Sequence, residues 1–142
     1  MNIPSKEELL LKVQNHFGIT LKALPNKQIF FQGNLDNGLV LVCTPQSKLY
    51  PNGSAWVDLT EIQVSLLKEA KLSILAFRLE SGKIYFLRFK ALQSYLTDQA
   101  MIYNKKEGNH WKLRIWPNEI RVNGNSNICR IKSFELSELE SN

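Results

Sequence analysis

Cysteine, histidine and long apolar runs are all scarce in this chain of 142 residues, and each shortage excludes a class of protein. Two cysteines, Cys43 and Cys129, are too few for a disulfide-stapled fold; both lie in apolar runs, so we expect buried free thiols. Two histidines, His16 and His110, make no zinc site without further ligands nearby. No apolar run has the length of a membrane span, and the first residues lack the apolar core of a signal peptide. We therefore expect a cytoplasmic protein without membrane contact.

The sequence also lacks the motifs of several common enzyme classes. It has no nucleophile elbow, no phosphate-cradling glycine loop and no supported Cys-His arrangement. What it does have is the length of one domain, 44% hydrophobic residues and a net charge of +5. These values predict a single domain over residues 1–142 with a genuine core. The positive charge favours an acidic partner, nucleic acid before anionic membrane, and the alternative is a basic surface without a partner.

Helical and strand patterns alternate along the first hundred residues. Ser5 and Glu8, like Thr60 and Gln63, have the spacing of a capping box at a helix start. The turn at 36–38 joins two strands as an antiparallel hairpin. In order, we expect a helix over 5–17, strands over 19–24, 28–32 and 39–43, a loop over 49–55, a helix from 60 with Ile62, Leu66, Leu67 and Ala70 buried, strands over 72–79 and 84–89, and a helix over about 90–101. The strand over 72–79 is apolar enough to be covered on both faces.

Basic and aromatic residues are interleaved from residue 104 onward. Between Trp111 and Trp116 the basic residues alternate with apolar ones, which predicts a strand with one cationic face. A turn and a returning strand over 119–122 complete a β-ribbon of the kind that enters a DNA major groove. The residues expected to contact DNA are Lys105, Lys106, Lys112, Arg114 and Arg121. The alternative is a sheet extension with a solvated cationic face.

A candidate metal site surrounds the strand predicted at 39–43. Gln46 and Lys48 are two residues apart, so on an extended chain both project to the same face. Asp36, in the turn before the strand, could meet them. An acid, a carbonyl oxygen and an ammonium at one point suit a metal-assisted attack on phosphate. Simpler roles also stay open, because Asp before Asn-Gly forms turns and a lone lysine is usually solvated.

Two acids at the start of the first helix are candidates for the same site. Glu8 is the capping partner of Ser5. Glu7 lies about 100° from the centre of the apolar stripe, at its boundary, where a side chain can face a cleft next to the core. Both acids could instead only complement the helix dipole. The sequence leaves the choice between Glu7 and Glu8 open.

This element order, together with Glu7 or Glu8, Asp36, Gln46 and Lys48, resembles the PD-(D/E)xK nuclease superfamily, and within it the homing endonucleases encoded in group I introns. The resemblance covers essentially the whole chain. It implies an α/β (α+β) fold with a restriction-endonuclease-like core at about 1–103, in which helices flank a central mixed β-sheet. A basic β-ribbon extension would occupy about 104–142.

The resemblance also implies a Mg²⁺-dependent endonuclease that makes site-specific double-strand breaks in double-stranded DNA by phosphodiester hydrolysis. It would act as a homo-oligomer, a dimer or tetramer. Mg²⁺, with Mn²⁺ expected to substitute, would be held by Asp36, Glu7 or Glu8 and the amide oxygen of Gln46, while Lys48 orients or activates the attacking water.

Two positions depart from the family pattern. Leu35 stands where the family has proline, and Gln46 replaces an acid, which removes a negative charge from the cation site. In another register, Cys43 and Thr44 would occupy the usual acid-x-lysine positions. The chain would then be a non-catalytic DNA-binding module on a degenerate nuclease fold. A third alternative is an oligomeric adaptor with its tryptophans buried at a subunit interface.

Overall fold

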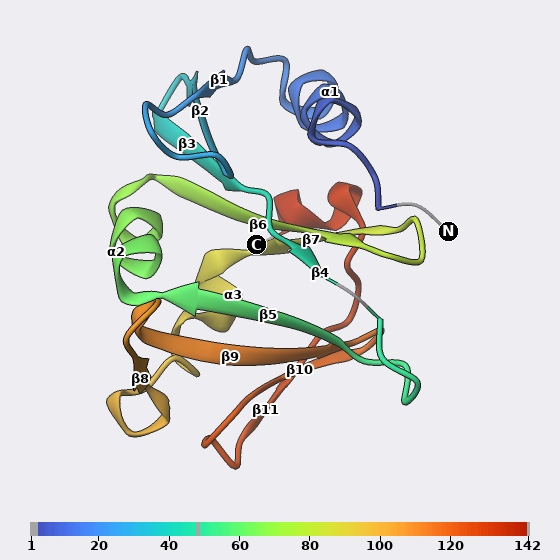
Figure 1. Ribbon diagram of the computed structural model, residues 1–142. Helices are drawn as coiled ribbons and strands as arrows, with labels where there is room; N and C mark the ends of the chain where they lie inside the picture. Colours follow the sequence, from blue (N-terminus) through green and yellow to red (C-terminus); the bar gives the residue numbers. More distant parts are fainter. Residues whose placement is uncertain (1–2, 48, 142) are drawn as a thin grey trace.

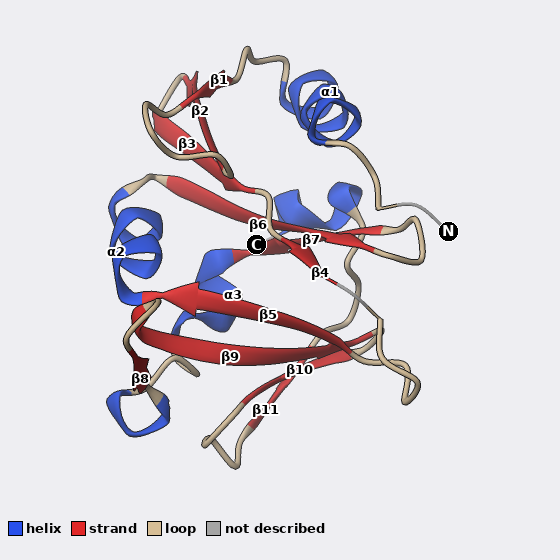
Figure 2. Ribbon diagram, in the orientation of Figure 1, coloured by secondary structure: helices blue, strands red, loops and turns tan. Residues whose placement is uncertain are grey.

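The computed structural model describes residues 3–47 and 49–141, and these form two β-sheets with helices around them (Figures 1 and 2). One sheet is mixed and the other is antiparallel. The expected combination of a helix-flanked mixed sheet and further strands is therefore confirmed at the level of an α+β protein. Within the described residues, no helix is long and apolar enough to cross a bilayer.

The mixed sheet is built around one fully covered strand, β6. Its strands are β1 (Lys22–Ala23), β2 (Phe30–Leu35), β3 (Gly38–Cys43), β4 (Gln46–Ser47), β6 (Leu72–Leu79) and β7 (Ile84–Arg88). The predicted hairpin of β2 and β3 is present, and β7 returns antiparallel to β6. Both β3 and β4 run parallel to β6 in one register, with Cys43 opposite Leu75 and Gln46 opposite Arg78. Residues 73–79 are all buried, as expected for a strand covered on both faces.

The two strands of the predicted basic ribbon are the central strands of the antiparallel sheet and do not form a separate extension. Its strands are β5 (Ala55–Thr60), β8 (Ile102–Asn104), β9 (Gly108–Trp116), β10 (Glu119–Val122) and β11 (Ile128–Arg130). The order is β11-β10-β9-β5, and β8 also pairs with β9. β5 is absent from the prediction, although its residues alternate between buried and half-buried. Because β5 pairs along β9, the ribbon is part of a wider sheet and not a free extension.

The helices agree with the prediction at their starts, and α1 also ends as predicted, at Phe17 before Gly18; the other two differ from it in part. They are α1 (Lys6–Phe17), α2 (Glu61–Glu69), α3 (Phe89–Gln93), and the 3₁₀ turns η1 (Asp98–Ala100) and η2 (Leu136–Ser141). Ser5 Oγ accepts a hydrogen bond from the backbone N–H of Glu8 (3.1 Å), and α2 has both hydrogen bonds of the capping box. Ile62 was expected inside but is 67% exposed, because Val64 and Leu67 form the buried side of α2.

The helix predicted over 90–101 is mostly irregular, and tertiary hydrogen bonds explain why. The carbonyl of Thr97 accepts from the indole N–H of Trp111 (2.8 Å), and the carbonyl of Tyr95 accepts from the Asn125 amide (3.0 Å). A continued helix would use these carbonyls for its own backbone N–H groups. Donors from a distant strand and from the β10–β11 turn therefore replace the last turns of the predicted helix.

Two hydrophobic clusters define the layers seen in Figure 1. One lies between the mixed sheet and α1, around Leu9, Val13 and Ile74. The larger one lies between the two sheets and includes α2 and α3. The free thiols of Cys43 and Cys129 are buried in this second cluster, as predicted. The inner face of the antiparallel sheet is thus part of the core, and its outer face carries half-buried and exposed polar side chains.

Candidate functional site

Asp36 and Gln46, two of the predicted metal ligands, lie at opposite ends of β6. Asp36 is in the exposed β2–β3 turn, and the following Gly38 packs against Lys71, just before β6. Gln46 pairs with Arg78 near the other end. From Lys71 to Arg78 a strand rises about 23 Å at about 3.3 Å per residue. Since Mg²⁺ holds its oxygen ligands at about 2.1 Å, the two side chains cannot share one ion in this fold.

Glu7 and Gln46 both approach Arg78, which is only 7% exposed. Burial lowers the pKa of the Arg78 guanidinium, and the negative charge of Glu7 acts in the opposite direction. The guanidinium also donates to the carbonyls of Thr44 (3.0 Å) and Pro4 (3.2 Å). Arg78 thus ties the start of α1 to the junction between β3 and β4. Glu7 of α1 therefore lies at the end of the sheet that carries Gln46, and Arg78 lies between α1 and β4.

The other two residues of the predicted catalytic set are placed differently. Glu8 points along the exposed side of α1, where its carboxylate lies 4.0 Å from the Lys12 ammonium. Lys48 lies outside the described residues, so its predicted role in activating water stays a prediction. The described members of the set therefore do not converge on one point: Asp36 is alone at its turn, and Glu8 faces away on the helix surface.

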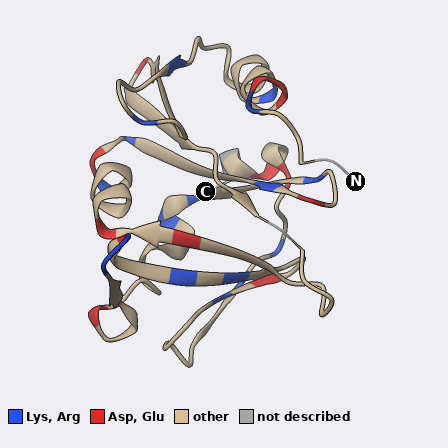
Figure 3. Ribbon diagram, viewed as in Figure 1, with Lys and Arg blue, Asp and Glu red and all other residues tan. Residues whose placement is uncertain are grey.

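The outer face of the antiparallel sheet gathers cations and indole rings in register. Trp56 of β5 lies opposite Arg114 of β9, and Arg114 lies opposite Arg121 of β10. Two residues further along β5, Asp58 lies opposite Lys112. Figure 3 shows the two basic segments of β9 beside the acidic segment of β5. The predicted alternation is therefore correct in placing Lys112, Arg114 and Arg121 on one face, and we call this surface the cationic face.

Arg114 is held at the centre of the cationic face by aromatic contacts. Its guanidinium carbon is 4.1 Å from the ring centroid of Trp56 and 5.7 Å from that of Trp116. Its Nε is buried without a hydrogen-bond partner, and it forms no salt bridge with the residues that the structure describes. Buried donors are nearly always satisfied, so an unsatisfied one needs an explanation. The buried Nε is not open to an incoming ligand, but the outer NH groups of this planar cation, which is stacked on an indole, have no hydrogen-bond partner among the described residues and are arranged to receive an anion.

The neighbouring cations are paired with carboxylates. Lys112 Nζ is 3.5 Å from Asp58, while Arg121 and Arg130 lie 2.5 Å and 3.4 Å from the two oxygens of Glu119. The Lys112–Asp58 pair lies near the surface, where ion pairs are weak, so phosphate can compete for this ammonium, whereas the Glu119 side chain is only 11% exposed and stays with its arginines. Lys105 and Lys106, which were also expected to contact DNA, lie exposed in the turn between β8 and β9, at the margin of this face.

The width of the antiparallel sheet does not fit the predicted insertion of a two-stranded ribbon into a DNA major groove. β9 is paired on both sides, by β5 and β10, and β10 is paired by β9 and β11. Four strands at about 4.8 Å spacing, with their side chains, exceed the width of about 12 Å of a major groove. Insertion of an isolated two-stranded ribbon, as predicted, is therefore not available. A nucleic acid would have to lie across the sheet.

Three potential metal ligands do meet, at one end of the cationic face. They are Asp58 of β5, Glu107 in the β8–β9 turn and His110 of β9, and their ligand atoms all lie within 4.8 Å of one another. This group is absent from the prediction, which stated that neither histidine makes a zinc site without further ligands nearby. Asp58 and Glu107 are far apart in sequence, and only the pairing of β5 with β9 brings them together. The alternation within 55–60 was the one local signal for that strand.

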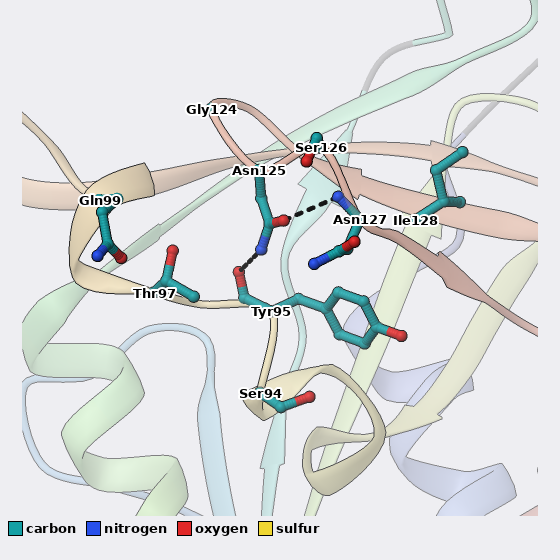
Figure 4. Close-up of a pocket in the computed structure, with 9 residues that line it drawn as sticks. All are labelled: Ser94, Tyr95, Thr97, Gln99, Gly124, Asn125, Ser126, Asn127 and Ile128. Atoms are coloured by element: carbon teal, nitrogen blue, oxygen red, sulfur yellow. Dashed lines mark hydrogen bonds between the residues drawn. The ribbon is translucent and has the colours of Figure 1, made fainter.

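A polar pocket of about 590 Å³ lies between the loop after α3 and the β10–β11 turn (Figure 4). The Asn125 side chain braces it, donating to the carbonyl of Tyr95 (3.0 Å) and accepting from the backbone N–H of Asn127 (2.9 Å). Its lining is uncharged at neutral pH: Ser94, Tyr95, Thr97, Gln99, Gly124, Asn125, Ser126, Asn127 and Ile128. Such a lining offers hydrogen bonds but no strong metal ligand or catalytic base. We therefore place the candidate site on the cationic face.

Comparisons with models of protein families, with curated proteins and with solved structures found no match to this chain. The resemblance to the PD-(D/E)xK nucleases accordingly stays a prediction from the sequence.

Proposed function

We propose that this protein binds DNA through the cationic face of its antiparallel sheet. The observation that carries the proposal is Arg114, a guanidinium stacked on Trp56 and next to Trp116, with no carboxylate partner among the described residues. Arginine held flat in this way presents a fixed fork of donors to a phosphate or to the edge of a base. The net charge of +5 adds long-range attraction for a polyanion.

The charge arrangement suits phosphate binding along a line. The four cations Lys112, Arg114, Arg121 and Arg130 face two carboxylates, Asp58 and Glu119. Four cations against two carboxylates leave a net positive charge on this face, so a phosphate can bind without displacing a carboxylate. Glu119 is 9% exposed and holds two arginines in place, so it orients the cations without blocking their outer sides.

The width of the cationic face affects whether single-stranded or double-stranded DNA fits it better. Double-stranded DNA is the partner that the family resemblance implies. A wide sheet that presents indole rings and arginines is a geometry on which single strands bind, with bases stacked on side chains and phosphates along the cations. We therefore propose tighter binding of a single strand than of a duplex of the same length.

Fluorescence anisotropy with labelled single-stranded and duplex DNA tests this proposal. Arg114→Ala is expected to weaken binding by about 1–3 kcal/mol if the arginine contacts a base, and mainly to reduce the salt dependence if it contacts phosphate. Lys90→Ala removes an exposed cation from α3 and serves as a matched control. Equal binding by the parent and Arg114→Ala, at every salt concentration, would move the interface to another surface. Failure of the parent to bind either DNA would favour an adaptor that uses its tryptophans to associate.

Metal-dependent DNA cleavage is a second candidate. It follows from the resemblance, and the approach of Glu7 and Gln46 to Arg78 is the observation in its favour. Asp36 lies at the far end of β6, so the predicted catalytic set that includes Asp36 is not assembled at one point. Cleavage assays with Mg²⁺ or Mn²⁺ should compare the parent with Lys48→Ala, Glu7→Gln and Asp36→Ala. Loss of cutting in the first two, and retention in Asp36→Ala, would support a centre at the Gln46 end. Undiminished cutting by all three would exclude it.

A further inference from the structure

We propose that Asp58, Glu107 and His110 bind a divalent transition-metal ion, with Zn²⁺ preferred over Mg²⁺. The three residues come from β5, the β8–β9 turn and β9, and their ligand atoms lie within 4.8 Å of one another. Two carboxylates and one imidazole are ligands that Zn²⁺ accepts. The proposal does not depend on DNA binding, because metal alone tests it.

The imidazole of His110 is already oriented as a metal ligand. Its Nδ1 lies 3.0 Å from the carbonyl oxygen of Gly108, and because a carbonyl only accepts, Nδ1 carries the proton. The lone pair is then on Nε2, which is buried without a hydrogen-bond partner in a side chain that is 1% exposed. Metal-bound histidines commonly have this arrangement, with the second ring nitrogen donating to a carbonyl. The buried lone pair of Nε2 is explained if it faces a cation.

The carboxylates of Asp58 and Glu107 lie near the Nε2 lone pair of His110. Glu107 Oε2 is 3.7 Å from His110 Nε2, too far for a good hydrogen bond but close to the separation of about 3.4 Å between two ligands of tetrahedral zinc. Two lone-pair atoms at this distance need a positive charge between them, which either a proton on Nε2 or a metal ion supplies. The side chains of Asp58 and Glu107 are 30% and 33% exposed, so both have freedom to close onto an ion.

One neighbouring cation opposes the metal and provides a specific test. Lys112 Nζ lies 3.5 Å from Asp58 Oδ2. A carboxylate has two oxygens, so Asp58 can keep the ammonium on one side and offer the other oxygen to a metal. Removal of the ammonium should then strengthen metal binding, because like charges repel. If the three residues had only a structural role, removal of the Lys112 ammonium would not strengthen metal binding.

A pocket adjoins one of the three ligands on the turn side. Glu107 and Thr60, the residue opposite His110, line a pocket of about 420 Å³ between segment 26–30 and the start of α2. Three protein ligands also leave a coordination position for water or for an oxygen of a bound molecule. This position would lie on the cationic face, near Lys112.

Isothermal titration of the full, tag-free chain with ZnCl₂, MnCl₂ and MgCl₂, after treatment with a chelator, tests the proposal. We expect one Zn²⁺ per chain and affinities in the order Zn²⁺, Mn²⁺, Mg²⁺. Asp58→Asn and Glu107→Gln should each weaken Zn²⁺ binding by at least about 10–100-fold, the cost of losing even an outer-shell partner. Lys112→Met should tighten it. Asp98→Asn and Glu69→Gln, in exposed acids elsewhere, are matched controls that should bind as the parent does.

Circular dichroism of each variant distinguishes lost binding from lost fold. His110→Ala is not needed, because its buried side chain also packs in the sheet. No Zn²⁺ binding by the folded parent would overturn the proposal. Binding that survives unchanged in both Asp58→Asn and Glu107→Gln would do the same and would point to another ligand set.

Discussion

At the scale of single residues, the position of Arg114 results from the pairing of three strands. β5 places Trp56 opposite it and β10 places Arg121 on its other side. Because the side chains of Arg114 and Arg121 lie on the outer face of the sheet, we expect their substitution to change the cationic face with little change in stability. A phosphate site could therefore be lost without a loss of stability, which makes the cationic face suitable for mutational tests.

The buried thiols predict a pH dependence of stability at the residue scale. Burial raises the pKa of the Cys43 thiol, because the thiolate would lose its hydration, and it raises that of Cys129 for the same reason. Above about pH 8.5 the unfolded chain releases these protons while the folded chain keeps them. The folded state then binds more protons, so the free energy of unfolding falls as pH rises.

Urea unfolding at pH 7.5, 8.5 and 9.5 measures this effect. Each thiol contributes a fall of up to about 1.4 kcal/mol per pH unit above the unfolded pKa. Cys43→Ala should flatten the slope relative to the parent, whatever its effect at neutral pH. An identical slope in both proteins would mean that the Cys43 thiol ionises as readily inside the fold as outside it.

At the scale of elements, β4 and β5 connect the two sheets through one side chain. Ser47 Oγ accepts from the backbone N–H of Trp56 (2.8 Å) and donates to the carbonyl of the same residue (2.5 Å). This side of β5 faces away from β9, so the serine acts in place of a neighbouring strand. The register of β5, and with it the position of Trp56 on the cationic face, depends partly on this contact.

Ser47→Ala should lower the free energy of unfolding by about 1–3 kcal/mol, because two backbone groups of Trp56 lose their partner in a half-buried position. Ser65→Ala, at an exposed position of α2, is the control and should change stability little. Chemical denaturation of both variants provides the comparison. If the two variants are equally stable, water replaces the serine without cost.

At the scale of the whole molecule, charge determines how DNA binding should respond to salt. If the four cations of the face each meet a phosphate, the logarithm of the binding constant for a single strand should fall with the logarithm of salt concentration with a slope of about −3. Titrations between low and physiological salt measure the slope. A slope near zero would show that the face does not neutralise phosphates.

The predicted homo-oligomer is also a property of the whole molecule, and it stays a prediction. A dimer or tetramer would let two faces act on one long target, as the resemblance implies. Sedimentation equilibrium should then give a mass that is a multiple of 16.4 kDa. A mass of one chain across the micromolar range would leave a single cationic face per particle.

Local patterns in the sequence determined which side of several strands faces the core, although they misplaced Ile62 on α2. The alternation through β9 placed Lys112 and Arg114 on one face, and the Thr60–Gln63 spacing predicted the capping box that starts α2. The continuous apolar run of β6 predicted a covered strand. These features depend on neighbours within a few residues, so periodicity and capping chemistry are enough to predict them.

Only the tertiary structure decided which strands are neighbours. The pairing of β5 with β9 joins residues that are fifty or more positions apart, and it comes from burying the apolar faces of both strands against β6. That pairing brings Asp58 to Glu107 and His110, and Trp56 to Arg114. The single register of β3 and β4 along β6 separates Asp36 from Gln46. Spacing in the sequence contains none of this information, because the burial of distant surfaces sets it.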